Sequence, residues 1–219
     1  MIDITQLARS EGVLTLAIIE DAQVAVSLAE ALRAGGLGAV EIALRTEQSL
    51  AAIEQVRRHE SSLTVLAGTV LSSDQAADAI SRGAQGIVSP GFNSELGAWC
   101  LGRDIPYVPG VATASEIMAA LNQGHRLLKF FPAGQLGGLR LLAALQAPFA
   151  GLGVSFLMTG GMRERDLPEA LAVPYVAAVG GTWIAPKAQV DAGDWESITR
   201  SARSAHNIVT GLRPEGSTP

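Results

Sequence analysis

One lysine lies inside an apolar segment, where it could act as a nucleophilic amine. Lys129 is the third residue of the run 127–133, Leu-Leu-Lys-Phe-Phe-Pro-Ala, and Lys187 is the only other lysine among the sixteen basic residues. A buried ammonium group is costly unless it is paired or gives up its proton. The neutral amine is also the form that makes a Schiff base with a ketone. The segment therefore predicts a Schiff-base lysine, and the alternative is a lysine that extends its charged end to the surface.

A second candidate pair follows the apolar run 39–43. Glu41 and Arg45 are separated by an even number of residues, so an extended strand would send both side chains to the same face. Their backbones would lie roughly 13 Å apart in that case. A carboxylate within an apolar run is uncommon without a partner or a role. We interpret Glu41 as a candidate acid or base, with an ordinary Glu–Arg pair as the alternative.

Two pairs of glycines end the last two apolar runs of the chain. Gly160 and Gly161 follow Thr159, and Gly180 and Gly181 precede Thr182. Paired glycines expose several backbone N–H groups, and the last two loops of an eight-stranded barrel frequently bind phosphate in this way. Tight turns without a ligand are the alternative.

These residues must be positioned by strands and helices that alternate along the whole chain. The apolar runs interpreted as strands are 13–19, 39–43, 64–66, 86–88, 106–108, 127–131, 154–158 and 176–179. The segments with a helical pattern are 22–34, 47–59, 73–82, 94–100, 114–121, 138–145, 164–171 and 195–212. Alternating strands and helices indicate a parallel sheet.

Eight such units are the number that closes a (β/α)8 barrel, with a doubly wound open sheet as the alternative. We predict an α/β TIM barrel that forms a single domain over residues 1–219, with an extra helix at each end. Residues 213–219 are expected to be a disordered tail. In a barrel the active site lies where the strands end, which is where the candidate residues occur.

Composition excludes several classes of function. The formal net charge is −5, which gives no general attraction to nucleic acid or to an anionic membrane. The chain has no segment resembling a secretory signal and no apolar run near the roughly 20 residues that span a bilayer. Its single cysteine, Cys100, is typical of a reducing compartment. We therefore expect a cytoplasmic protein without a nucleic-acid or membrane partner.

No metal or cofactor is expected. The three histidines, His59, His125 and His206, are scattered and lack the spacing of metal ligands. Neither a phosphate-binding P-loop nor a dinucleotide fingerprint occurs. Cys100 is interpreted as a small core residue and not as a nucleophile.

Seven short motifs, in this order, resemble those of the 2-keto-3-deoxy-6-phosphogluconate and 2-keto-4-hydroxyglutarate (KDPG/KHG) aldolases. The resemblance extends from about Val13 to His206. The motifs are Glu41-x-x-x-Arg45-Thr46, Gly68-Thr69-Val70, Ser89-Pro90-Gly91, Pro109-Gly110, Lys129-Phe130-Phe131-Pro132-Ala133, Thr159-Gly160-Gly161 and Gly180-Gly181-Thr182-Trp183.

The resemblance implies a class I aldolase, a carbon–carbon lyase, on a (β/α)8 barrel that commonly forms a homotrimer. It implies that Lys129 is the Schiff-base lysine and Glu41 the general acid/base. The implied substrate contacts are Arg45 and Thr69 at the pyruvate carboxylate, Pro90 and Phe131 around the pyruvyl part, Gly160, Gly161, Gly181 and Thr182 at the phosphate, and Thr159.

The implied reaction cleaves 2-keto-3-deoxy-6-phosphogluconate into pyruvate and glyceraldehyde 3-phosphate, so a small 2-keto acid and a phosphoaldehyde are the expected partners. Alternatives are the galactonate epimer, unphosphorylated 4-hydroxy-2-oxo acids such as 2-keto-4-hydroxyglutarate, or a barrel that binds a phosphate metabolite without turnover. The sequence departs from the family at Thr182, where serine is familiar, at Thr15, where proline is familiar, and at Gly134-Gln135. These departures leave the lysine chemistry intact and bear on the aldehyde partner.

Overall fold

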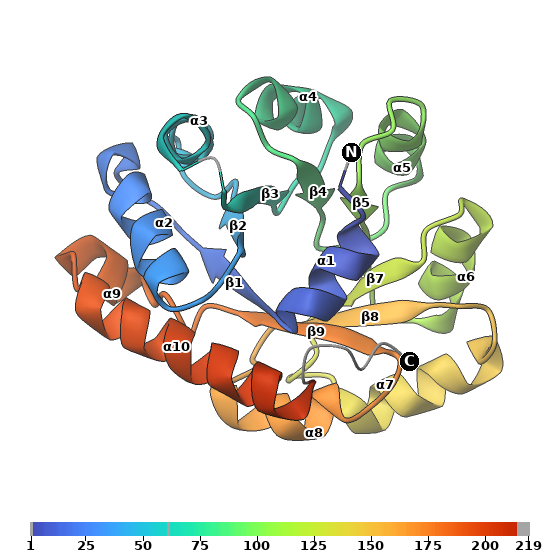
Figure 1. Ribbon diagram of the computed structural model, residues 1–219. Helices are drawn as coiled ribbons and strands as arrows, with labels where there is room; N and C mark the ends of the chain where they lie inside the picture. The colour runs from blue at the N-terminus through green and yellow to red at the C-terminus, as the bar shows by residue number, and fades with distance from the viewer. Residues whose placement is uncertain (1, 61, 214–219) are drawn as a thin grey trace.

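The computed structural model is a barrel of parallel strands with helices around it (Figure 1). It describes residues 2–60 and 62–213. The strands are β1 (Val13–Ala17), β2 (Ala39–Ala43), β3 (Thr64–Gly68), β4 (Gly86–Val88), β5 (Tyr107–Val108), β6 (Gly110–Val111), β7 (Leu127–Phe130), β8 (Ser155–Thr159) and β9 (Val176–Gly181). Their order is β5-β4-β3-β2-β1-β9-β8-β7-β6, and every pairing is parallel. The predicted (β/α)8 barrel is confirmed.

The predicted fifth strand is divided into two short strands by Pro109. Proline has no N–H group with which to continue a sheet ladder. The residues before it, β5, pair with β4, and the residues after it, β6, pair with β7. The carbonyl of Pro109 accepts a hydrogen bond of 2.8 Å from the backbone N–H of Lys129. The barrel thus closes through residues 107–111, which explains nine strands where the sequence predicts eight.

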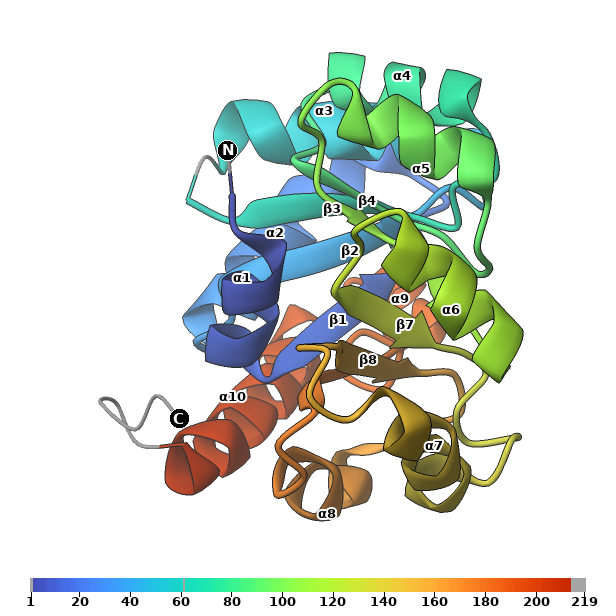
Figure 2. The ribbon, with the colours of Figure 1, turned by 90° about the vertical axis from the view of Figure 1, so that its right-hand side faces the viewer.

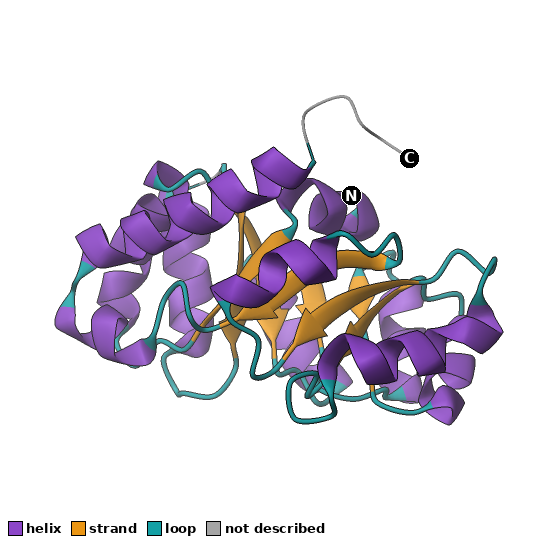
Figure 3. Ribbon diagram, turned by 90° about the horizontal axis from the view of Figure 1, so that it is seen from below, coloured by secondary structure: helices purple, strands orange, loops and turns teal. Residues whose placement is uncertain are grey.

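The helices form the outer layer around the strands (Figure 3). They are α1 (Ile4–Glu11), α2 (Ala25–Ala34), α3 (Ser49–His59), α4 (Ser73–Ser81), α5 (Ser94–Leu101), α6 (Ala114–Asn122), α7 (Gly138–Gln146), α8 (Leu167–Leu171), α9 (Lys187–Ala192) and α10 (Trp195–Leu212), with short 3-10 turns at Ala22–Val24, Ala147–Phe149 and Glu164–Asp166. The extra helices predicted at the two ends are α1 and α10. The six-residue α9 was not predicted, because it is too short to show a periodic apolar pattern.

Side-chain caps begin several helices directly after strands. The hydroxyl of Ser72 accepts from the backbone N–H of Gln75 at the start of α4. Thr113 and Glu116 form a reciprocal capping box at the start of α6. Such caps satisfy N–H groups that the first helical turn leaves free. They fix the loops at the end of the barrel where the candidate site residues lie.

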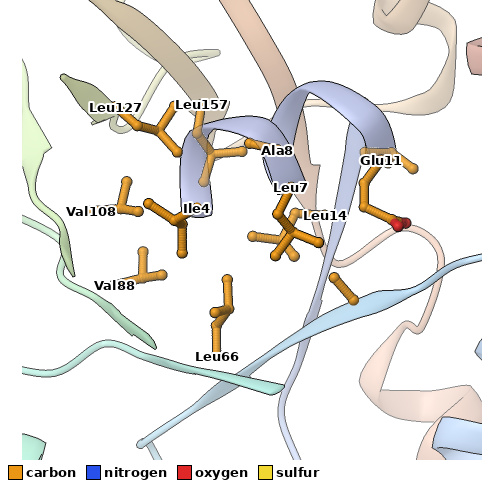
Figure 4. Close-up of a pocket in the computed structure, with 12 residues that line it drawn as sticks. Ile4, Leu7, Ala8, Glu11, Leu14, Leu66, Val88, Val108, Leu127 and Leu157 are labelled. Atoms are coloured by element: carbon orange, nitrogen blue, oxygen red, sulfur yellow. The ribbon is translucent and has the colours of Figure 1, made fainter. Parts of the chain in front are cut away.

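The other end of the barrel is filled and apolar. Figure 2 shows α1 on the side where the strands begin, and Ile4, Leu7 and Ala8 of α1 pack against the barrel interior. The interior residues are Leu14, Ala39, Leu66, Val88, Val108, Leu127, Leu157, Ala177 and Ala178. The cavity left beneath α1 measures about 20 Å³, room for about one water molecule (Figure 4). A sugar acid does not fit in that volume, and the candidate residues Arg45, Thr69 and Gly160 follow the ends of β2, β3 and β8 at the opposite end of the barrel.

The carboxyl-terminal helix is anchored at its end. The guanidinium of Arg213 donates hydrogen bonds of 2.8 Å to the carbonyls of Val176 and Ala177 and of 3.0 Å to that of Arg9. The tail predicted at 213–219 therefore begins with an anchored residue, and its remainder, 214–219, lies outside the described residues.

Candidate active site

A buried lysine and a buried glutamate meet across the inside of the barrel. Strand β7 carries Lys129, and strand β2 carries Glu41; three strands, β1, β9 and β8, lie between them in the sheet. The lysine Nζ lies 3.0 Å from the glutamate Oε1, and the two side chains are 5% and 1% exposed. The charged end of the lysine is inside the protein and not at the surface. The snorkelling alternative from the sequence is therefore wrong.

Gly68, at the end of β3, provides the space for the glutamate. A Cβ atom added at Gly68 would lie 2.3 Å from the Oε1 atom of Glu41 and 2.6 Å from its Cγ atom. Contacts this short are repulsive. The missing side chain at Gly68 therefore allows Glu41 to extend to Lys129.

This pair can exchange a proton without the help of solvent. The ammonium of Lys129 donates to the carboxylate of Glu41 along a bond of ordinary hydrogen-bond length. Transfer along that bond would leave a neutral amine and a neutral acid. The products are a nucleophile and a proton donor in contact. The ring of Phe131 covers the lysine, with its centroid 5.6 Å from Nζ.

Arg45 and Thr69 form a second polar pair at the ends of two neighbouring strands. The Nε of Arg45 donates to the hydroxyl of Thr69 over 3.3 Å. Thr69 has a φ of 58°, a left-handed conformation that is unfavourable for a β-branched residue. Such strain is often stored where a side chain must be aimed for function. Arg45 is exposed, so its planar end is free to bind an anion.

The ion pair between Glu41 and Arg45, the alternative considered from the sequence, does not form among the described residues. Strand β2 ends at Ala43, and the chain then turns, with the Leu44 N–H donating to Gly68 and the Arg45 N–H donating to Ala43. The turn carries Arg45 out of the strand geometry that the two-residue period assumes. Among the described residues, the ion-pair partner of Glu41 is Lys129.

The loop after β4 crosses close beside the lysine strand. A Cβ atom at Gly110 would lie 2.2 Å from the carbonyl atoms of Pro90, and Gly110 is the register partner of Lys129. The hydroxyl of Ser89 donates to the carbonyl of Gly91 over 2.6 Å and lies 2.6 Å from the phenol oxygen of Tyr107. These bonds hold Pro90 near the site.

The sequence interpretation missed Gly68, Ser89, Gly110 and Tyr107 as residues that build the site. The glycines lie in the family motifs but have no side chain to suggest a role. A tyrosine within the apolar run 106–108 was the one available signal, because a buried phenol needs a hydrogen-bond partner.

Thr159 and the glycine pairs lie together at the ends of β8 and β9. Thr159 pairs in register with Gly180, and Gly160 and Gly161 follow with φ values of 93° and 74°. The hydroxyl of Thr159 is buried and has no hydrogen-bond partner among the described residues. An unpaired buried hydroxyl is costly, so this atom is a ready contact for a bound molecule.

The last glycine pair is packed from one side. A Cβ atom at Gly181 would lie 2.3 Å from the ring of Trp183, whereas Thr182 between them is exposed. The predicted site residues from β7, β8 and β9 are therefore brought to one end of the barrel, on neighbouring strands.

The other candidate nucleophiles are elsewhere and are poorly suited to the role. Lys187 is exposed and pairs with Asp191 at 2.6 Å and Glu20 at 3.5 Å. Its hydrogen bond with Asp191 raises the pKa of Lys187, so it keeps its proton. Burial raises the pKa of Cys100 to about 12, so its thiol stays protonated.

Two further classes of feature are not found in the part of the chain that the structure describes. No group of three or more histidine, cysteine, aspartate or glutamate residues there is placed to hold a metal ion. No helix in the described ranges 2–60 and 62–213 is long and apolar enough to cross a membrane.

Comparison with known proteins gives a consistent set of relatives. A family model described as KDPG and KHG aldolase matches residues 4–201. A 2-dehydro-3-deoxy-phosphogluconate aldolase of Pseudomonas aeruginosa is 43% identical over 92% of this chain and 91% of its own length. A KHG/KDPG aldolase of Escherichia coli K12 is 37% identical over 88% of this chain and 90% of its own.

A solved structure is similar in fold over nearly the whole chain. It is a KDPG aldolase from Legionella pneumophila, with pyruvate captured as a covalent carbinolamine intermediate. The TM-score is 0.89 at 34% sequence identity, and the match covers 93% of this chain and 98% of that one.

Proposed function

The chain belongs to the KDPG and KHG aldolase family, and we propose that it cleaves 2-keto-3-deoxy-6-phosphogluconate into pyruvate and glyceraldehyde 3-phosphate. It is a class I aldolase, which forms a Schiff base with its substrate. The observation that carries the proposal is the buried contact of 3.0 Å between Lys129 and Glu41. It supplies an amine and an acid–base group in direct contact inside the barrel, a fold whose active sites lie where the strands end.

The first half of the reaction forms the iminium. Lys129, after passing its proton to Glu41, attacks the C2 ketone of the substrate and gives a carbinolamine. Glu41 then protonates the departing hydroxyl, so that water leaves and a C=N bond forms. The resulting positive nitrogen withdraws electrons from C3.

The second half breaks the carbon–carbon bond. Glu41, again a carboxylate, takes the proton of the C4 hydroxyl, and the electrons of the C3–C4 bond move toward the iminium. The aldehyde leaves, and an enamine of pyruvate stays on Lys129. Glu41 returns its proton to C3, and water releases pyruvate from the lysine. One carboxylate acts in turn as base and as acid throughout.

The carboxylate end of the substrate is assigned to Arg45 and Thr69. A guanidinium can bind both oxygens of a carboxylate at once. The hydrogen bond of 3.3 Å between the two side chains directs them to one place. Pro90 and Phe131 would pack around the pyruvyl carbons, because Pro90 lies against Gly110, the register partner of Lys129, and the ring of Phe131 lies near the amine.

The phosphate end is assigned to the loops that follow β8 and β9. Gly160 and Gly161 have left-handed φ values, and successive backbone N–H groups in turns of this kind can bind phosphate oxygens. Gly181 and Thr182 would complete the site on the next strand. The unpartnered hydroxyl of Thr159 lies between this end and the lysine and is assigned to a substrate oxygen.

A second candidate substrate class is an unphosphorylated 4-hydroxy-2-oxo acid such as 2-keto-4-hydroxyglutarate. The name of the Escherichia coli relative includes both activities, which favours this alternative. The same lysine and glutamate would act on either substrate, so comparing kcat/KM on the two separates them.

We propose further that the protein is a cytoplasmic homotrimer, in keeping with its family. Five large apolar side chains are well exposed in the described residues and offer surface for association: Leu71, Leu101, Met118, Leu152 and Leu212. Sedimentation of the purified protein tests the assembly, and a monomer at micromolar concentration would contradict it.

The reaction is tested by removing the amine and counting pyruvate released from the phosphorylated substrate. Lys129→Met should abolish cleavage, but it leaves Glu41 buried without its partner, which costs about 3–5 kcal/mol. The double variant Lys129→Met/Glu41→Gln leaves no charge unpaired and should fold normally while remaining inactive. Turnover at the wild-type rate in either folded variant would refute the proposed mechanism.

A further inference from the structure

The loop between β7 and α7 lies directly over the proposed phosphate turn. The backbone N–H of Ala133 donates to Thr159 over 2.8 Å, and the N–H of Gly134 donates to Gly160 over 2.7 Å. These two bonds continue the pairing of β7 with β8 beyond the ends of the strands. The next residue, Gln135, is therefore held at a fixed place on the rim of the site. It belongs to the Gly134-Gln135 pair that departs from the family pattern.

The side chain of Gln135 faces Gly161. A Cβ atom at Gly161 would lie 3.0 Å from Nε2, 3.1 Å from Oε1 and 3.3 Å from Cδ of Gln135. All three atoms of the amide group are thus close to Gly161, one of the two glycines assigned above to the phosphate. Gln135 is exposed, and its amide has no hydrogen-bond partner in the described part of the chain.

A primary amide beside a glycine turn has a defined chemistry. It offers two N–H donors without a charge, and each can reach a phosphate oxygen. Gly161 bears no side chain that would block the approach of a ligand to the amide. The amide of Gln135 would add side-chain donors to the backbone N–H groups of Gly160 and Gly161.

We propose that Gln135 determines specificity for the phosphorylated end of the substrate, by donating hydrogen bonds from its amide to the phosphate. This inference rests on the proposed function, since it assumes that the substrate binds with its far end at Gly160 and Gly161. Gln135 takes no part in bond cleavage. It contributes only to the binding of substrates whose far end reaches the amide and carries a negatively charged group that accepts hydrogen bonds.

The test compares two substrates that differ only in the phosphate, 2-keto-3-deoxy-6-phosphogluconate and 2-keto-3-deoxygluconate. Gln135→Ala should lower kcat/KM for the phosphorylated substrate about tenfold, the scale of one hydrogen bond to a charged group. Gln135→Glu should lower it further, because a carboxylate repels phosphate, and added salt should restore part of the loss. Both variants should leave kcat/KM for the unphosphorylated substrate within about twofold of wild type.

Two controls separate this effect from damage to the protein or to the chemistry. Gln146→Glu makes the same charge change at the other end of α7 and should leave the ratio of the two kcat/KM values unchanged. Exchange of the C3 protons of pyruvate into solvent should proceed at the wild-type rate in every variant, because pyruvate lacks the far end.

The outcomes are distinct. An unchanged ratio in Gln135→Ala and Gln135→Glu, with wild-type pyruvate exchange, would overturn the assignment of Gln135 and leave the proposed function standing. Absence of pyruvate exchange in the wild-type protein would overturn the proposed function, and the assignment with it. Equal losses on both substrates would show that Gln135 supports the loop and does not recognise phosphate.

Discussion

Gly68→Ala is the substitution that most directly tests how the glutamate is positioned. The new methyl group would lie 2.3 Å from Oε1 and 2.8 Å from Cδ of Glu41. Non-bonded carbon and oxygen atoms settle at roughly 3.5 Å, so the carboxylate must retreat by about 1 Å. A contact of 3.0 Å with Lys129 would then lengthen beyond hydrogen-bond distance.

The expected losses follow from the two roles of that contact. General acid–base catalysis contributes about 10²–10⁴-fold to such reactions, so pyruvate C3 exchange should slow by at least 10²-fold. Overpacking the core should cost about 1–3 kcal/mol of unfolding free energy. In a chain of this size that cost lowers Tm by about 2–4 °C for each kcal/mol. The variant should therefore be folded at 25 °C and nearly inactive.

Exchange is measured by proton NMR in deuterated buffer, beside the melting curve of each protein. Gly211→Ala is the matched control, because a Cβ atom there meets nothing within 4 Å. It should leave exchange unchanged and should not lower Tm, because alanine is a better helix former than glycine within α10. If folded Gly68→Ala exchanged pyruvate protons at the wild-type rate, the assigned position of Glu41 in catalysis would be wrong.

Three further predictions concern groups around the barrel. Tyr107→Phe removes the phenol hydroxyl that contacts Ser89. The variant should lose about 1 kcal/mol of unfolding free energy and several-fold in kcat/KM. An unchanged midpoint of urea unfolding with unchanged kinetics would show that the contact has no positioning role. Burial raises the pKa of Cys100 to about 12, so iodoacetamide at pH 8 should modify it only in urea, and rapid labelling of the native protein would contradict its burial. Burial also raises the pKa of Glu11 above its ordinary 4.5, so the native state holds this proton more tightly than the unfolded chain, and the glutamate's contribution to stability is lost as pH rises through that range. Glu11→Gln keeps an acceptor for the Gly38 N–H and should flatten the stability profile above pH 4.5, as read from urea unfolding at several pH values; a profile parallel to wild type would exclude Glu11 as its source.

Much of the barrel could be predicted from the sequence because its strands are buried on both faces. The run 86–88 matches β4 at both ends, since Gln85 and Ser89 bound it. The run 39–43 also matches β2, which begins after Gly38 and ends two residues before Arg45. The final helix, 195–212, is also matched, because its apolar residues recur with helical spacing. A local sequence pattern predicts an element correctly where its buried residues recur with the period of that strand or helix.

The contact between Glu41 and Lys129 could not be predicted from a local sequence pattern. Glu41 and Lys129 are 88 residues apart and lie on strands that are not neighbours, so only closure of the barrel brings them together. The sequence favoured Arg45 as a neighbour on the strand, and the turn after Ala43 removes it. A single sequence carries no record of which side chains meet across the barrel interior.

Positions without side chains were equally hidden. Gly68 and Gly110 matter through the atoms that they leave out, beside Glu41 and Pro90. Gln135 was recognised only as an unusual residue, because its contact with Gly161 depends on the hydrogen bonds between two loops. Such effects become visible only when the backbone is placed.

The central claim is that the amine of Lys129 forms the Schiff base. Incubation with pyruvate and borohydride, followed by peptide mass mapping, tests it directly. We expect one reduced pyruvyl adduct per chain, on the peptide that contains Lys129, and none on that peptide when borohydride is omitted. An adduct on Lys187, or no covalent product at all, would contradict the account.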